Sequence, residues 1–74
     1  MCRSIKTLRG VEPPATEDDV AAAARQFVRK ISGYRTPSQA NRDAFEEAVA
    51  DVAATTCALL DRIGVPVAAG PPER

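Results

Sequence analysis

The residue whose type and position most suggest chemistry is Cys2, which directly follows Met1. A small second residue usually permits removal of the initiating methionine, and this would leave a thiol and a free amine on adjacent carbon atoms. The positive charges of Arg3 and Lys6 would favour the reactive thiolate. The sequence contains no His that could serve as a base, so we assign no catalytic residue. A thiol-dependent role for Cys2 remains one alternative function.

Basic residues gather in the first part of the chain. Residues 1–42 hold eight basic and four acidic side chains, whereas residues 43–74 hold two and six, for a net charge of zero. Cations beside an aromatic ring, as at Tyr34 and Arg35, are typical of surfaces that bind phosphate or nucleic acid. The candidate ligand-binding residues are Cys2, Arg3, Lys6, Arg9, Lys30, Tyr34 and Arg35. The competing interpretation is a solvated basic face that complements the acidic long helix, and we favour it over binding of nucleic acid.

Metal chemistry has little support in the sequence. A structural zinc site requires four nitrogen or sulfur ligands, and the chain has two Cys and no His. The acidic run at residues 17–19 opens a predicted helix, where the helix dipole favours negative charge. We therefore predict no metal site and no cofactor, and we assign no role to Cys57.

A long helix over residues 38–63 is the element around which the chain is organised. Apolar side chains recur there at helical spacing and predict one buried seam. The seam consists of Phe45, Val49, Val52, Thr56, Leu59 and Ile63, and the Thr56 hydroxyl is expected to bond to the carbonyl of Val52. The opposite side carries a stripe of Ala50, Ala54 and Ala58. This stripe fits either a close helix contact or helix propensity on a wet face.

A second helix is predicted from Thr16, which serves as its N-cap, to a stop at Gly33. Its expected buried stripe is Val20, Ala24, Phe27 and Ile31, with Arg25 and Arg29 pointing outward. The short turn that follows implies that the two helices are antiparallel neighbours. Either Thr36 or Ser38 is expected to cap the long helix.

The two ends of the chain are expected to behave differently. The spacing of Ile5 and Leu8 predicts a turn of helix between Ser4 and Gly10, docked on the long helix. Residues 65–74 contain three prolines and a glycine, and we predict a flexible tail there. The sequence thus predicts one small helical domain over residues 1–64 and a tail over 65–74.

Several segments together resemble one family of small bacterial proteins, domain-of-unknown-function family 2277. They are MCRSIKTL at the start, EPPAT before the first helix, QFVRKISG at its end, and then PSxAN and AFxxAV. The resemblance covers residues 1 to 63, in order and at the family's spacing. The chain differs in having Ser4 where Asn is usual and Val11 where an aromatic residue is usual. The resemblance implies no activity, because the family is uncharacterised.

We therefore predict an all-α fold, an antiparallel helical hairpin with a docked N-terminal segment. The core is thin, and two helices leave apolar edges exposed, so we expect a homodimer resembling a four-helix bundle. No run approaches the ~20 apolar residues of a membrane span, and the first residues lack the apolar block that a signal peptide needs. We expect a cytoplasmic interaction module without enzymatic activity, which binds its own copies or an unknown protein partner.

Overall fold

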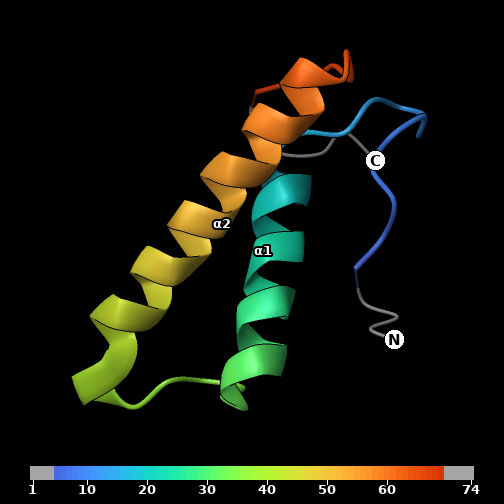
Figure 1. Ribbon diagram of the computed structural model, residues 1–74. Coiled ribbons are helices and arrows are strands. Elements are labelled where there is room, and N and C mark those ends of the chain that lie inside the picture. The colour runs from blue at the N-terminus through green and yellow to red at the C-terminus, as the bar shows by residue number, and fades with distance from the viewer. Residues whose placement is uncertain (1–4, 70–74) are drawn as a thin grey trace.

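The structure is a computed structural model that describes residues 5–69. Its regular elements are the helix α1 (Glu17–Ser32), a 3-10 turn η1 (Gln39–Asn41) and the helix α2 (Arg42–Arg62). Figure 1 shows the two helices side by side and antiparallel, joined by a short loop at one end. Apart from one isolated bridge, residues 5–69 contain no β-structure, so the predicted all-α hairpin is confirmed.

Helix α1 begins and ends where its capping residues predict. The Thr16 side chain accepts a hydrogen bond from the Asp19 backbone N–H at 3.2 Å, and the Asp19 carboxylate accepts from the Thr16 N–H at 2.9 Å. This reciprocal capping box satisfies donors that a helix start otherwise leaves unpaired. At the other end Gly33 adopts φ 75°, and its N–H bonds to the Arg29 carbonyl at 2.9 Å.

Helix α2 begins later than predicted. The predicted caps Thr36 and Ser38 were wrong, because the N-cap of α2 is Asn41, and Ser38 instead precedes η1 without a side-chain hydrogen bond. The backbone N–H of Asn41 bonds to the Ser38 carbonyl at 3.0 Å. The 3-10 turn therefore provides hydrogen-bond partners for part of the backbone N–H groups at the helix start, without a side-chain cap. Helix α2 ends at Arg62, close to the predicted end.

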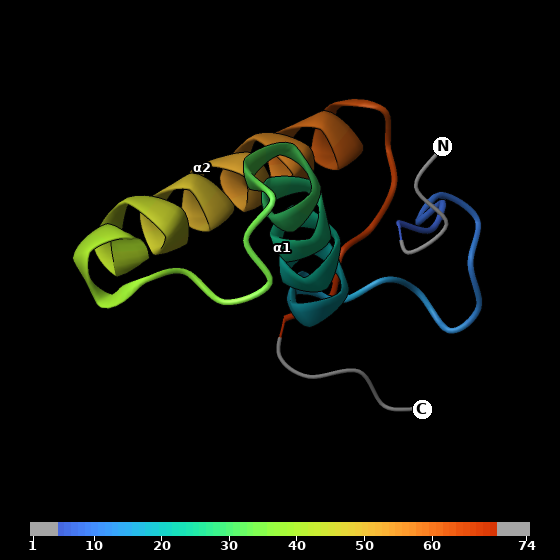
Figure 2. The same cartoon turned by 90° about the horizontal axis from the view of Figure 1, so that it is seen from below.

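The core lies between one row of side chains on each helix. Ala24 and Val28 of α1 pack against Phe45 and Val49 of α2, with Val52 at the edge. In this cluster the buried side chains are four residues apart on each helix. Rows of this kind are inclined to the helix axis, so packing them together makes the helices cross obliquely. Figures 1 and 2 both show α2 running at an angle to α1.

This oblique crossing corrects two predictions about burial. On α1, Val20, Ala24 and Val28 are buried, whereas Phe27 and Ile31 are 43% and 68% exposed. On α2, Leu60 is buried, whereas the predicted seam residues Leu59 and Ile63 are 55% and 53% exposed. The predicted stripes ran along the helix axes, but the helices meet along inclined rows. Phe45 and Val49 are buried as predicted, and Thr56 Oγ1 donates to the Val52 carbonyl at 2.7 Å as predicted.

The N-terminal segment is not helical in its described part, so the predicted turn of helix was wrong. Residues 5–15 run as an irregular strap with a turn at Gly10, where φ is 78°. Ile5 and Leu8 still approach the hairpin, because both border a groove between the helices. A turn of helix as short as the predicted one is unstable alone. Because Ile5 and Leu8 can make the same contacts from an extended strap, the segment does not need to be helical.

The described part of the predicted tail contacts the start of α1. The Ala68 N–H donates to the Ala15 carbonyl, and the Ala68 carbonyl accepts from the Glu17 N–H, both at 2.8 Å. The second bond satisfies another free donor of the α1 N-terminus. Ala15 and Thr16 are buried at this junction, at 1% and 5% exposure. Nothing in the Pro-rich composition of the tail indicated this pairing.

Candidate functional site

The structure separates the sequence-predicted site residues into two places. Lys30, Tyr34 and Arg35 line one pocket at the hairpin turn, together with Gln26 and Arg29. Lys6 instead borders a groove and a small pocket beside Asp19, Ala22 and Ala23. Arg9 is exposed at the turn of the strap, and Cys2 and Arg3 lie outside the described residues. The candidate cations therefore do not converge on one point.

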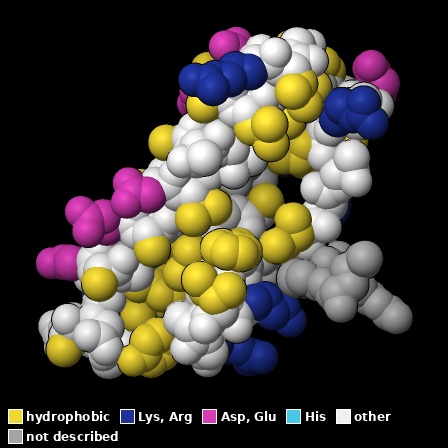
Figure 3. Space-filling model, in the orientation of Figure 1, with side chains coloured by type: hydrophobic (Ala, Val, Ile, Leu, Met, Phe, Trp, Pro, Cys, Tyr) yellow, Lys and Arg dark blue, Asp and Glu magenta, His cyan; other side chains and the backbone are white. Residues whose placement is uncertain are grey.

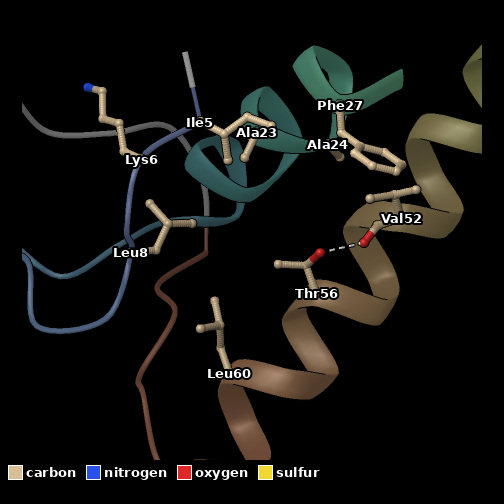
Figure 4. A pocket seen from close by; sticks show the side chains of 9 residues that line it. All are labelled: Ile5, Lys6, Leu8, Ala23, Ala24, Phe27, Val52, Thr56 and Leu60. Atoms are coloured by element: carbon tan, nitrogen blue, oxygen red, sulfur yellow. Dashed lines mark hydrogen bonds between the residues drawn. The ribbon is translucent and has the colours of Figure 1, made fainter. Parts of the chain in front are cut away.

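The first place is an apolar groove of about 280 Å³ between the strap, α1 and α2. Its lining is almost entirely apolar: Ile5, Lys6, Leu8, Ala23, Ala24, Phe27, Val52, Thr56 and Leu60. Figure 4 shows the Phe27 ring near Val52, while the Lys6 amine points away from the groove. The Thr56 hydroxyl is engaged by its bond to the Val52 carbonyl, so it leaves no free donor in the wall. The groove can bury apolar side chains, and its described lining offers no catalytic group.

The second place is a pair of basic pockets at the turn of the hairpin, with volumes of about 360 and 380 Å³. Arg29 and Arg35 line both pockets. The first is completed by Gln26, Lys30, Gly33 and Tyr34, and the second by Arg25, Thr36, Pro37, Arg42, Phe45 and Glu46.

One ion pair joins the two helices at the second pocket. The Arg25 guanidinium donates two hydrogen bonds to the Glu46 carboxylate, both at 2.8 Å, and lies 5.9 Å from the centre of the Phe45 ring. The hydrogen bonds from Arg25 hold the pKa of Glu46 below its usual value of 4.5, and the charges of Arg25, Arg42 and Arg29 act in the same direction. Hydrogen bonding to Glu46 likewise raises the pKa of Arg25.

The loop between the helices is tied down at Tyr34. Its hydroxyl oxygen accepts a hydrogen bond from Asn41 Nδ2 at 3.0 Å, and its backbone N–H donates to Ser32 Oγ at 3.2 Å. These bonds connect the loop to the end of α1 and to the start of α2. Tyr34 thus positions the segment that carries Arg35.

The structure brings three of the predicted candidates, Lys30, Tyr34 and Arg35, into one pocket, and it adds two residues that the sequence did not single out for a site, Arg42 and Phe27. Arg42 stands seven residues after Arg35, and only the turn η1 brings it to the same pocket. Phe27 was assigned to the core because it fits the helical stripe. Phe27 lies one row away from Ala24 and Val28, and whether that row is buried depends on the crossing angle. The sequence pattern of a single helix does not predict this angle.

Other kinds of site find no support in residues 5–69. No group of three or more His, Cys, Asp or Glu side chains in that range could hold a metal ion. Cys57 is a half-buried free thiol in the middle of α2. No helix in the described part of the chain is long and apolar enough to cross a bilayer.

Comparison with known proteins finds a family that is uncharacterised. The model of the family described as "Uncharacterized conserved protein (DUF2277)" matches residues 1–74. No curated protein and no solved structure matches the chain. The family match extends over both the apolar groove and the basic pockets. The resemblance of the sequence motifs is thereby confirmed, and the chain belongs to the DUF2277 family of uncharacterised conserved proteins.

Proposed function

We propose that this DUF2277 protein is a small interaction module, without catalytic activity of its own, that assembles as a symmetric dimer. The interface is the apolar face, which we define as the groove together with the exposed Phe27, Ile31, Leu59 and Ile63. The observation that supports this proposal is the exposure of these four large side chains, between 43% and 68%, beside an open apolar groove. Contiguous apolar surface of this kind on a small protein usually marks an interaction site.

Helical geometry supports one continuous face. Leu59 follows Val52 by seven residues, so the two side chains differ by only about 20° around α2. Ile31 follows Phe27 by four residues, which corresponds to about 40° around α1. Phe27 and Val52 both line the groove, so the exposed residues extend its two walls on the same side of the hairpin. In the view of Figure 3, hydrophobic side chains gather over both helices.

The energetics favour covering this face. A chain of 74 residues rarely stabilises itself by more than ~3–5 kcal/mol through its own core. Burying the exposed portion of a Phe, Leu or Ile contributes about 1–2 kcal/mol for each side chain. Four such residues on each of two copies would contribute about 8–16 kcal/mol in total, and the part that exceeds the association cost of about 4–15 kcal/mol would stabilise the dimer. Self-association is therefore an effective way for this hairpin to gain stability.

The charges around the face favour a second copy as its occupant. The exposed Asp51 lies on the flank of α2 between the apolar face and the alanine stripe, about 80° around the helix from Leu59. Lys6 borders the groove on the side of the strap. In a two-fold arrangement each α2 edge would lie against the strap side of the other copy, so unlike charges would meet.

The proposal is tested by sedimentation equilibrium of the full chain at micromolar concentration. We expect a mass near twice 7.9 kDa for the wild type. Phe27→Ser and Leu59→Ser should weaken association, because each removes apolar area from the interface. Ala54→Ser is the matched control, since Ala54 is exposed on the opposite side of α2. A monomeric wild type would contradict the proposal, and so would an equal loss of association in Ala54→Ser, which would move the interface to the alanine stripe.

A further inference from the structure

The turn of the hairpin gathers more cationic than anionic side chains. Among the described residues, the two basic pockets are lined by five cations and a single carboxylate, Glu46. The cations are Arg25, Arg29, Lys30, Arg35 and Arg42. Like charges held together in a partly enclosed site repel one another unless an anion neutralises them.

Among residues 5–69, Arg25 is the one cation of this set whose side chain has a hydrogen bond to another residue. Both terminal nitrogens of Arg25 bond to Glu46, so the one carboxylate is already occupied by a bidentate partner. The Nε of Arg29 is buried and has no hydrogen-bond partner within the described part of the chain. A buried donor without an acceptor costs about 1–3 kcal/mol, so an acceptor placed at this nitrogen would be bound favourably. Arg29 lies where the two pockets meet, since it lines both.

The loop that carries Tyr34 and Arg35 is held in place before any ligand arrives. The Asn41 amide fixes Tyr34 to the start of α2, and the Gly33 N–H bonds to the Arg29 carbonyl at 2.9 Å. Arg35 directly follows Tyr34, so its backbone is positioned against the end of α1. A ligand would therefore not have to order the loop, and that entropic cost of binding is avoided. The N-terminus of α2 adds partial positive charge at this end and the C-terminus of α1 adds partial negative charge, so the side chains rather than the helix dipoles set the charge of the site.

We infer that the basic pockets bind the phosphate group of a small phosphorylated molecule, with Arg29 and Arg35 as its principal ligands. The phosphate oxygens supply several strong acceptors, and a guanidinium matches them with parallel N–H donors. Pockets of about 360 and 380 Å³ are of the size that small ligands occupy. Tyr34, which is 37% exposed, offers a ring on which the rest of the molecule can pack. A small ligand fits better than a nucleic acid because the cations occupy one end of a chain with no net charge.

The inference is tested with inorganic phosphate as the probe on the full ¹⁵N-labelled chain, against chloride at matched ionic strength. The Nε–H signal of Arg29 should shift as phosphate saturates the site, because the buried donor gains an acceptor. Arg35→Gln should weaken phosphate binding about tenfold, since one charge-assisted contact is lost. Arg29→Lys keeps the charge but removes the planar fork, and we expect a several-fold loss. Arg62→Gln is the matched control, because it removes one exposed cation at the other end of α2 and should bind like the wild type.

Three results would overturn the inference. They are equal effects of phosphate and chloride, equal losses in Arg62→Gln and Arg35→Gln, and an Arg29 signal that does not move at saturation. A fourth arm uses a short single-stranded RNA. If the RNA binds far more tightly than phosphate, and a steep salt dependence reports several phosphate contacts, the small-ligand assignment is wrong and the site is a nucleic-acid interface. None of these outcomes depends on dimerisation, because the residues varied here are not part of the apolar face.

Discussion

The two phenylalanines of the chain occupy opposite environments. Phe45 is 5% exposed and packs against Ala24, Val28 and Val49 under the Arg25 guanidinium. Phe27 is 43% exposed and forms a wall of the apolar groove. The same residue type therefore serves the core of the hairpin at one position and its outer surface at the other.

This difference predicts unequal effects of truncation on the free energy of unfolding. Phe45→Ala should destabilise the folded chain by about 3–5 kcal/mol, because it removes a buried ring and leaves a cavity. Phe27→Ala should cost clearly less at concentrations where the chain is monomeric, since its ring is already partly in water. Urea unfolding followed by circular dichroism measures both. Equal losses would show that Phe27 belongs to the core of the single chain.

Glu46 predicts an acid-sensitive contribution to stability. Its pKa in the folded chain is lowered by Arg25, so the unfolded chain takes up the proton first as the pH falls. The contribution is complete above the usual pKa of 4.5 and is lost as the pH falls through the lowered value. Between about pH 7 and about pH 3, Glu46→Gln should therefore lose less stability than the wild type. The idea fails if Glu46→Gln loses as much stability as the wild type over this range.

At the level of elements, the N-terminal capping box of α1 makes a contribution to the free energy of unfolding that a substitution can measure. Thr16→Ala removes the oxygen that accepts the Asp19 N–H, and Thr16 is 5% exposed. We expect a loss of about 0.5–2 kcal/mol in the free energy of unfolding. Thr16→Ser keeps the hydroxyl and should recover much of that loss. If alanine and serine destabilise the protein equally, the methyl group of Thr16 matters and the cap does not.

Features that depend on local sequence could be predicted, and features that depend on the angle between elements could not. Thr16 and Gly33 mark both ends of α1, because capping needs only neighbouring residues. The burial of Phe45 and Val49 also follows from helical spacing. Leu59 and Ile63 share that spacing but are exposed, because the oblique crossing carries the contact to Leu60.

In the candidate site as well, only the positions of residues that are close in sequence could be predicted. Lys30, Tyr34 and Arg35 are close in sequence, so a short turn must keep them together, and they line one pocket. The position of Lys6 depends on where the strap docks on the helices, and tertiary contacts determine this. Lys6 lies beside Ala22, eight residues before Lys30 in α1, and this separation corresponds to about 12 Å along the helix. The N-terminal cations therefore could not be assigned to the pocket from sequence alone.

At the level of the whole molecule, the C-terminal segment closes the fold by pairing with the start of α1. The Glu17 N–H donates to Ala68, so its exchange with solvent should be slow while this pairing holds. Deleting residues 66–74 should accelerate hydrogen exchange at Glu17 far more than at Val49, which lies in the centre of α2. Nuclear magnetic resonance of the deuterated chain measures both amides. Unchanged exchange at Glu17 would show that the pairing adds no protection.

The apolar face is the central claim about the whole molecule, and isotope-filtered nuclear Overhauser measurements test it most directly. A mixture of ¹³C-labelled and unlabelled full chains reports only contacts between different copies. The proposed dimer predicts cross-peaks from the Phe27 ring to the Leu59 methyl groups of the other copy, and none from the buried Phe45. Intermolecular cross-peaks confined to Ala50, Ala54 and Ala58, or a complete absence of cross-peaks at millimolar concentration, would contradict the account.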